Sequence, residues 1–266
     1  MIKLSPNMRF SQNISRGSVS VKIKKADELN NKVFQRMLQL YDKKNSCGLN
    51  TVQNNYNSIL PERKNVELFP IMVKETDDLS ASTTIQERRE NFLSGYSIEL
   101  PAEKKKKLNI LDLSQLMHES THVLDYLLNP KYIANYKKMC ERNIYNKTYF
   151  NLYEKYFYNP DDMRKNGTKQ MLAIAEEETR KGLRRVPQKD KLIFLNYIKY
   201  SMEMEFHAYN QDLKYTKILQ KIGKPINQAD LQNFNDFMAF PEKINLVNKL
   251  IREELAKIKS KMIINL

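Results

Sequence analysis

The stretch "LDLSQLMHESTHVLDYLLNP" (residues 111–130) combines a strong helix signal with an uncommon arrangement of polar residues. Its apolar residues recur three and four positions apart, which predicts an amphipathic helix over residues 113–128. Asp112 stands at the expected N-cap with Gln115 three residues later, as in a capping box. Pro130 ends the pattern, because the residue before a proline avoids helical geometry.

Two of the three histidines in the chain lie inside this helix, as His118 and His122 of an H-E-x-x-H pattern. Residues four apart on a helix are rotated by about 40° and separated by one turn, so both imidazoles can reach one ion. Glu119 is rotated by about 100° from His118, which places it beside such an ion as a base. The pattern is typical of zinc hydrolases. The alternative is two histidines next to a glutamate with no metal.

A zinc ion that keeps one open position needs a third protein ligand. One candidate is Glu141, about 20 residues downstream, as in thermolysin-like sites. The stretch "YSMEMEFHAYNQD" (residues 200–212) offers three more, Glu203, Glu205 and His207.

Helical geometry separates the three candidates in that stretch. At 100° per residue, Glu205 shares a face with apolar side chains, whereas Glu203 and His207 share the opposite, polar face. A buried carboxylate is costly unless a cation accompanies it. For Glu205 that cation is either zinc or the Lys or Arg of a core salt bridge.

The residues "HESTHVLD" (118–125) and "EFHA" (205–208) resemble zinc metallopeptidases of the gluzincin kind, most closely the lethal-factor-like group. There, H-E-x-x-H-x-x-D is followed by a ligand glutamate in an E-x-x-A helix. The resemblance implies that His118, His122 and Glu205 bind Zn2+, and that Glu119 is the general base. It also implies that Asp125 orients an imidazole from outside the ligand shell.

The resemblance covers only these two short pieces of the chain. The tyrosine that this group places about two turns before the ligand glutamate falls here on Ile198. The group that would stabilise an oxyanion is therefore not assigned by the resemblance.

Strand signals precede the motif and helix signals follow it, and this order predicts an α+β fold. The resemblance implies that this fold is zincin-like. We expect strands at residues 18–25, 65–73 and 95–100 ("GYSIEL"). Zincins use an edge strand before the active-site helix to align a peptide, and the resemblance makes "GYSIEL" the candidate for this strand.

A helix is predicted from residue 26, with Gly48 as its stop, and further helices over residues 113–128, 169–182 and 189–222. A turn or linker is predicted over residues 159–167, which end in Asn166-Gly167, and more helices at the C-terminus. We therefore expect an α+β part over residues 1–130 that ends in the active-site helix. A helical part over residues 131–266 would supply the third ligand, and the two together would form one catalytic domain.

The expected function is hydrolysis of a peptide bond in a protein or peptide substrate by a zinc endopeptidase. The alternative is a basic nucleic-acid-binding or interaction protein with a structural or vestigial metal site. The net charge of +14 would suit an acidic partner such as nucleic acid. However, the basic residues form separate patches, and no nucleic-acid-binding signature is found.

The sequence also limits where the protein is expected to act. Residues 1–17 have no apolar segment of the kind found in Sec signal peptides, and no apolar run approaches the roughly 20 residues of a membrane span. Cys47 and Cys140 belong to no C-x-x-C pair. We expect a cytoplasmic protein, or an effector or toxin delivered by a secretion system that uses no signal peptide.

Overall fold

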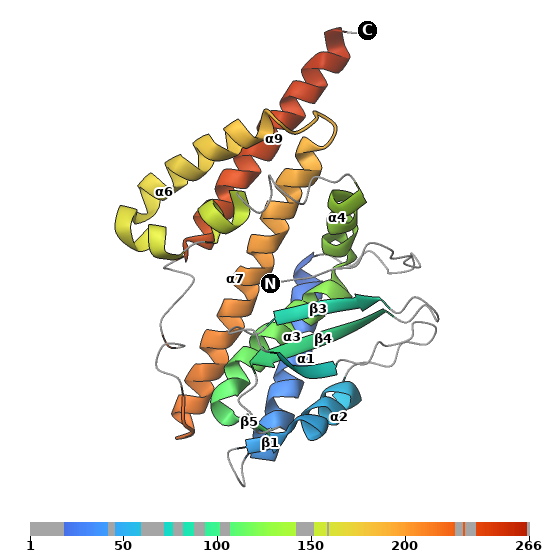
Figure 1. The fold of residues 1–266 in the computed structure, drawn as a ribbon, viewed down its shortest axis with the longest axis vertical. Helices are drawn as coiled ribbons and strands as arrows, with labels where there is room; N and C mark the ends of the chain where they lie inside the picture. Colours follow the sequence, from blue (N-terminus) through green and yellow to red (C-terminus); the bar gives the residue numbers. More distant parts are fainter. Residues whose placement is uncertain are drawn as a thin grey trace. The chain divides into compact units, whose positions relative to one another are not determined.

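A computed structural model of the chain describes residues 19–41, 46–59, 72–76, 82–87, 94–101, 107–141, 152–158, 160–226, 231 and 238–264 (Figure 1). These residues are largely helical and include two small sheets, an arrangement that is compatible with the predicted α+β class. No helix among them is long and apolar enough to cross a membrane.

The chain divides into two compact units. Unit 1 contains Met1–Asn129 and Ala208–Gln232, and unit 2 contains Pro130–His207 and Asn233–Leu266. Helix α7 (Lys191–Lys221) is continuous, and its second half belongs to unit 1. Residues 208–232 thus belong to the same unit as residues 1–129.

Among its described residues, unit 1 contains α1 (Val19–Tyr41), α2 (Leu49–Ile59), α3 (Leu113–Leu128), the second half of α7 and five short strands. The strands are β1 (Ser46–Gly48), β2 (Met72–Thr76), β3 (Ser82–Glu87), β4 (Ser94–Pro101) and β5 (Lys107–Asn109). β1 pairs antiparallel with β5. In the other sheet β4 lies between β2, which is parallel to it, and β3, which is antiparallel.

The core of unit 1 lies where α3 packs against α1 and against strands β3 and β4 (Figure 1). The buried apolar residues of α1 are spaced three and four apart, so they form one stripe along the helix. They are Ala26, Leu29, Val33, Phe34, Met37 and Tyr41. On α3 the buried apolar residues include Leu113, Leu116, Met117, Val123 and Leu124. The predicted helix over residues 113–128 is confirmed residue for residue.

Two predictions about strands were wrong. Residues 19–25 do not form a strand, because α1 begins at Val19. Adding residues to an existing helix gains one hydrogen bond each, so a short alternating segment next to a strong helical period can join that helix. "GYSIEL" is a strand, but it lies in β4, which is paired on both sides and is therefore not an edge. Of residues 65–73, only Met72 and Val73 are described, and they begin β2.

The predicted capping box at Asp112 was also wrong. Asp112 has helical dihedral angles and makes no side-chain cap bond to α3. A 3-10 turn, η1 (Ile110–Asp112), precedes α3 and moves the cap one turn upstream. Asn109 is the capping residue there, and its backbone N–H donates to Asp112 Oδ2 at 2.7 Å.

Unit 2 contains α4 (Pro130–Glu141), the short π-helix η3 (Tyr153–Phe157), α6 (Pro160–Leu183), the first half of α7, and α9 (Phe240–Ile264). α6 is broken at Gly167, where φ is 72°, but residues 160–166, which were part of the predicted turn or linker, are helical. The predicted helices over 169–182 and 189–222 are confirmed in α6 and α7. At the C-terminus, α9 is one long helix.

A buried lysine joins α9 to η3 within unit 2. Lys243 is 1% exposed, and its Nζ donates to the carbonyl oxygen of Phe157 at 2.6 Å. Burial lowers the pKa of Lys243 from 10.5 to about 8. Because the unfolded chain then holds this proton more tightly than the folded chain, Lys243 reduces stability below about pH 8 and this cost disappears as the pH rises.

The free energy of unfolding should therefore rise in the wild-type protein between about pH 8 and pH 10.5 relative to a Lys243→Met variant. The full difference is on the order of 3 kcal/mol. Denaturant titrations of both proteins at several pH values measure it. Lys259→Met, which removes an exposed lysine of α9, should behave like the wild type. Parallel pH profiles for wild type and Lys243→Met would contradict the assignment.

Candidate metal centre

Helix α3 presents two imidazoles side by side. The Nε2 atoms of His118 and His122 lie 3.1 Å apart. Their rings meet at 81°. Two nitrogen ligands of a tetrahedral zinc ion, each about 2.0–2.1 Å from the metal, lie about 3.3 Å from each other. Both Nε2 atoms can therefore bind one ion with little movement. The side chain of His118 is 13% exposed and His122 is 3% exposed, so the pair is largely shielded from solvent.

The ring of His118 is held in place by α7. Asp212 Oδ2 lies 2.8 Å from His118 Nδ1, which places the proton on Nδ1 and leaves the lone pair of Nε2 free for a metal. The ring of Tyr209 meets the same imidazole edge-on, with ring centroids 4.7 Å apart. Asp212 and Tyr209 belong to the half of α7 that lies in unit 1. Together they fix the orientation of His118.

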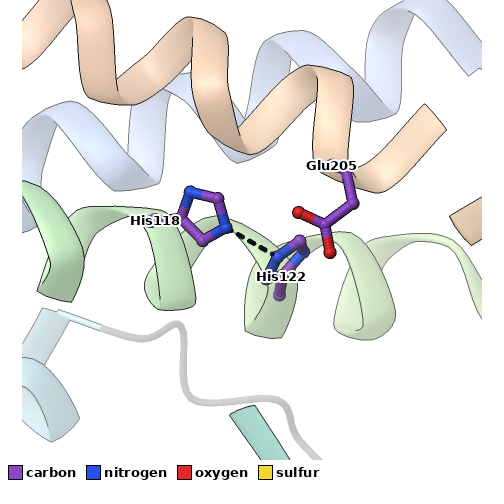
Figure 2. A group of neighbouring side chains, drawn as sticks. All are labelled: His118, His122 and Glu205. Carbon is purple, nitrogen blue, oxygen red and sulfur yellow. Dashed lines mark hydrogen bonds between the residues drawn. The ribbon is translucent and has the colours of Figure 1, made fainter. Parts of the chain in front are cut away.

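Glu205 stands one turn before Tyr209 on the same continuous helix. One donor atom from each of His118, His122 and Glu205 lies within 4.8 Å of the other two (Figure 2). The Oε2 atom of the glutamate is buried. Two imidazole nitrogens and one carboxylate oxygen form a donor set that suits zinc, with a fourth position left open. The structure thus brings together the three residues that the sequence predicted as ligands.

The competing candidates for the third ligand are placed differently. Glu203 interacts within unit 2, where its Oε2 accepts from Tyr132 Oη at 3.3 Å and its Oε1 lies 3.5 Å from Lys199 Nζ. Neither Glu203 nor His207 is part of the metal-binding group that the described residues form. The side chain of Glu141 lies outside the described part of the chain. Among the described side chains, Glu205 is the carboxylate that lies close enough to both histidines to share a metal ion with them.

The other predicted site residues lie on α3. Glu119 and Asp125 are both buried, at 6% and 7% exposure. Their roles, as general base and as the acid that orients an imidazole, stay predictions. Ile198 is fully buried, so the position that holds a tyrosine in the lethal-factor-like group is part of the core here.

Asp212 is the site residue that the sequence analysis missed. It lies seven residues after Glu205, a spacing that places two helical residues on the same face about two turns apart. A search of that face for a carboxylate able to pair with a histidine would have found it. The prediction instead followed the family pattern to Asp125, on the helix that carries the histidines.

Replacing Asp212 by alanine should weaken zinc binding about 10–100-fold, because the pairing carboxylate fixes the tautomer and the ring orientation of His118. Competition with a chelator of known affinity measures the dissociation constant. Glu203→Gln is the matched control, since it alters an acid of the same helix that is paired in unit 2. Equal zinc affinities for wild type and Asp212→Ala would show that Asp212 does not support a metal ligand.

The chain was compared with protein-family models, with curated proteins and with solved structures, and none of them matches. The assignment of this centre therefore depends on its own geometry. That geometry consists of the two facing Nε2 atoms, the Asp212 carboxylate behind one of them, and the nearby glutamate.

Proposed function

We propose that the chain is a zinc-dependent endopeptidase of the zincin kind, with His118, His122 and Glu205 as metal ligands. The observation that carries the proposal is the convergence of the three donor atoms within 4.8 Å, on a helix whose sequence is H-E-x-x-H. The His118–Asp212 bond adds support, because it prepares one imidazole in the tautomer that binds a metal.

Three protein ligands and one open position are typical of catalytic zinc, whereas structural zinc has four protein ligands. When bound, zinc supplies Lewis acidity, which polarises a peptide carbonyl and lowers the pKa of water toward about 7. The near absence of solvent around His122 and Glu119 would strengthen electrostatic interactions at the site.

Glu119 is the proposed general base. It follows His118 directly, so its side chain leaves α3 about 100° around the axis, beside the ligand face. In the proposed reaction Glu119 takes a proton from the attacking water and passes it to the amine that leaves as the peptide bond breaks. One carboxylate thus serves both proton transfers.

Strand β3 replaces β4 as the proposed peptide-aligning edge. Among the described strands, β3 pairs only with β4, and both strands contact α3. An extended peptide can add to a free edge by backbone hydrogen bonds, which do not depend on the side chains of the substrate. The substrate would therefore be an extended segment of a protein.

Glu119→Gln should retain about one equivalent of zinc while peptide cleavage falls by about 10²–10⁴-fold, the usual contribution of a general base. Metal analysis gives the zinc content. Mass spectrometry of a diverse peptide library incubated with each protein detects cleavage whatever the sequence of the substrate.

Two controls complete this test. The double variant His118→Ala/His122→Ala should lose both zinc and cleavage, and Glu203→Gln should retain both. Undiminished cleavage by Glu119→Gln would refute the mechanism. Full zinc content in the double variant would refute the site.

A further inference from the structure

Hydrogen bonds join the H-E-x-x-H segment of α3 to α1. Ser120 and Thr121, the two variable positions of the motif, are both fully buried. Ser120 Oγ donates to Asn30 Oδ1 at 2.7 Å, and Asn30 Nδ2 donates to Thr121 Oγ1 at 2.7 Å. Thr121 in turn donates to the carbonyl of Met117 at 2.8 Å. Asn30 is itself fully buried, so its amide uses both ends on the motif helix.

The neighbouring residues of α1 bind the part of α7 that belongs to unit 1. Asn31 Oδ1 accepts from Lys214 Nζ at 2.8 Å and from Tyr215 Oη at 3.1 Å. Asp27 Oδ1 accepts from Gln211 Nε2 at 2.6 Å. Gln211 directly precedes Asp212, the residue that orients His118. One short segment of α1 therefore holds both the helix that carries the histidines and the helix that carries Asp212.

Hydrogen bonds at these positions constrain the helices differently from apolar contacts. Apolar contacts such as those between α1 and α3 are non-directional, so they specify the register of the two helices less sharply. A buried amide with two directional bonds cannot slide, since it would lose its partners inside the core. Single buried polar residues fix helix register in this way in coiled coils.

We propose that Asn30 is a positioning residue for the metal centre. By fixing the register of α3 on α1, Asn30 sets the position of His118 along the helix axis. Asp27 and Asn31 of α1 hold the segment of α7 that carries Asp212, so α1 sets where His118 and Asp212 meet. The inference depends on the proposed function in one respect, namely that the positioned centre binds zinc.

The test removes the hydrogen bonds while keeping the core filled. In the triple variant Asn30→Leu/Ser120→Ala/Thr121→Val, both partners of each bond made by Asn30 become apolar side chains of similar size. Such replacements are close to neutral for stability. We expect a melting temperature near that of the wild type, together with a zinc dissociation constant raised about tenfold or more, as when the support of a metal ligand is lost.

Two further variants keep the test decisive. Thr179→Val removes a fully buried hydroxyl from unit 2 and should leave zinc affinity unchanged. Ser120→Ala removes one bond and should show a smaller loss of zinc affinity, which provides a result even if the triple variant does not fold. Wild-type zinc affinity in a folded triple variant, or in Ser120→Ala if the triple variant does not fold, would overturn the inference.

A second readout does not need a metal. The Nδ1 proton of His118, bonded to Asp212, should give a downfield NMR signal in the metal-free wild type and in Thr179→Val. This signal should be lost or shifted in the triple variant. A wild-type protein that binds no zinc would refute the proposed function. The NMR signal alone would then decide the inference about Asn30, and an unchanged signal in the triple variant would overturn it.

Discussion

The hydrogen bond between His118 and Asp212 is the interaction on which the proposed centre depends. It joins residues 94 positions apart in sequence, and it decides which nitrogen of His118 faces His122. Because Asp212 keeps the proton of His118 on Nδ1, the Nε2 atom of His118 accepts the 3.1 Å hydrogen bond from the Nε2 atom of His122. With the bond to Asp212, one imidazole is prepared as a ligand before any metal arrives.

The surrounding architecture holds the two helices that form this bond. α1 contacts α3 through a continuous apolar stripe and through the Asn30 amide, and it bonds α7 through Asp27 and Asn31. The rings of Phe34 on α1 and Tyr215 on α7 are stacked, with centroids 4.4 Å apart, and add apolar contact between these two helices. α1 is thus a common support for both halves of the hydrogen bond, although it contributes no proposed ligand.

The parts of this arrangement that depend on local sequence were predictable. The helix over residues 113–128 follows from its own leucine spacing, and the polar and apolar faces of α7 selected Glu205 over Glu203. Features set by tertiary pairing were not. The alternation in residues 19–25 was overridden by a helix that continues from Ala26, and the central position of β4 depends on β3, which carries weak strand signals. Asp212 shares the helix face of Glu205, but the sequence does not show that this face meets His118, and the prediction followed the family pattern to Asp125 instead.

X-ray absorption at the zinc edge of the zinc-loaded protein tests the central claim most directly. Our account predicts two imidazole nitrogens and a carboxylate oxygen at about 2.0–2.2 Å from zinc, without sulfur. It also predicts that Glu205→Gln alters this shell while Glu203→Gln leaves it unchanged. Sulfur at about 2.3 Å, or a spectrum that Glu205→Gln does not change, would show that the metal is held elsewhere.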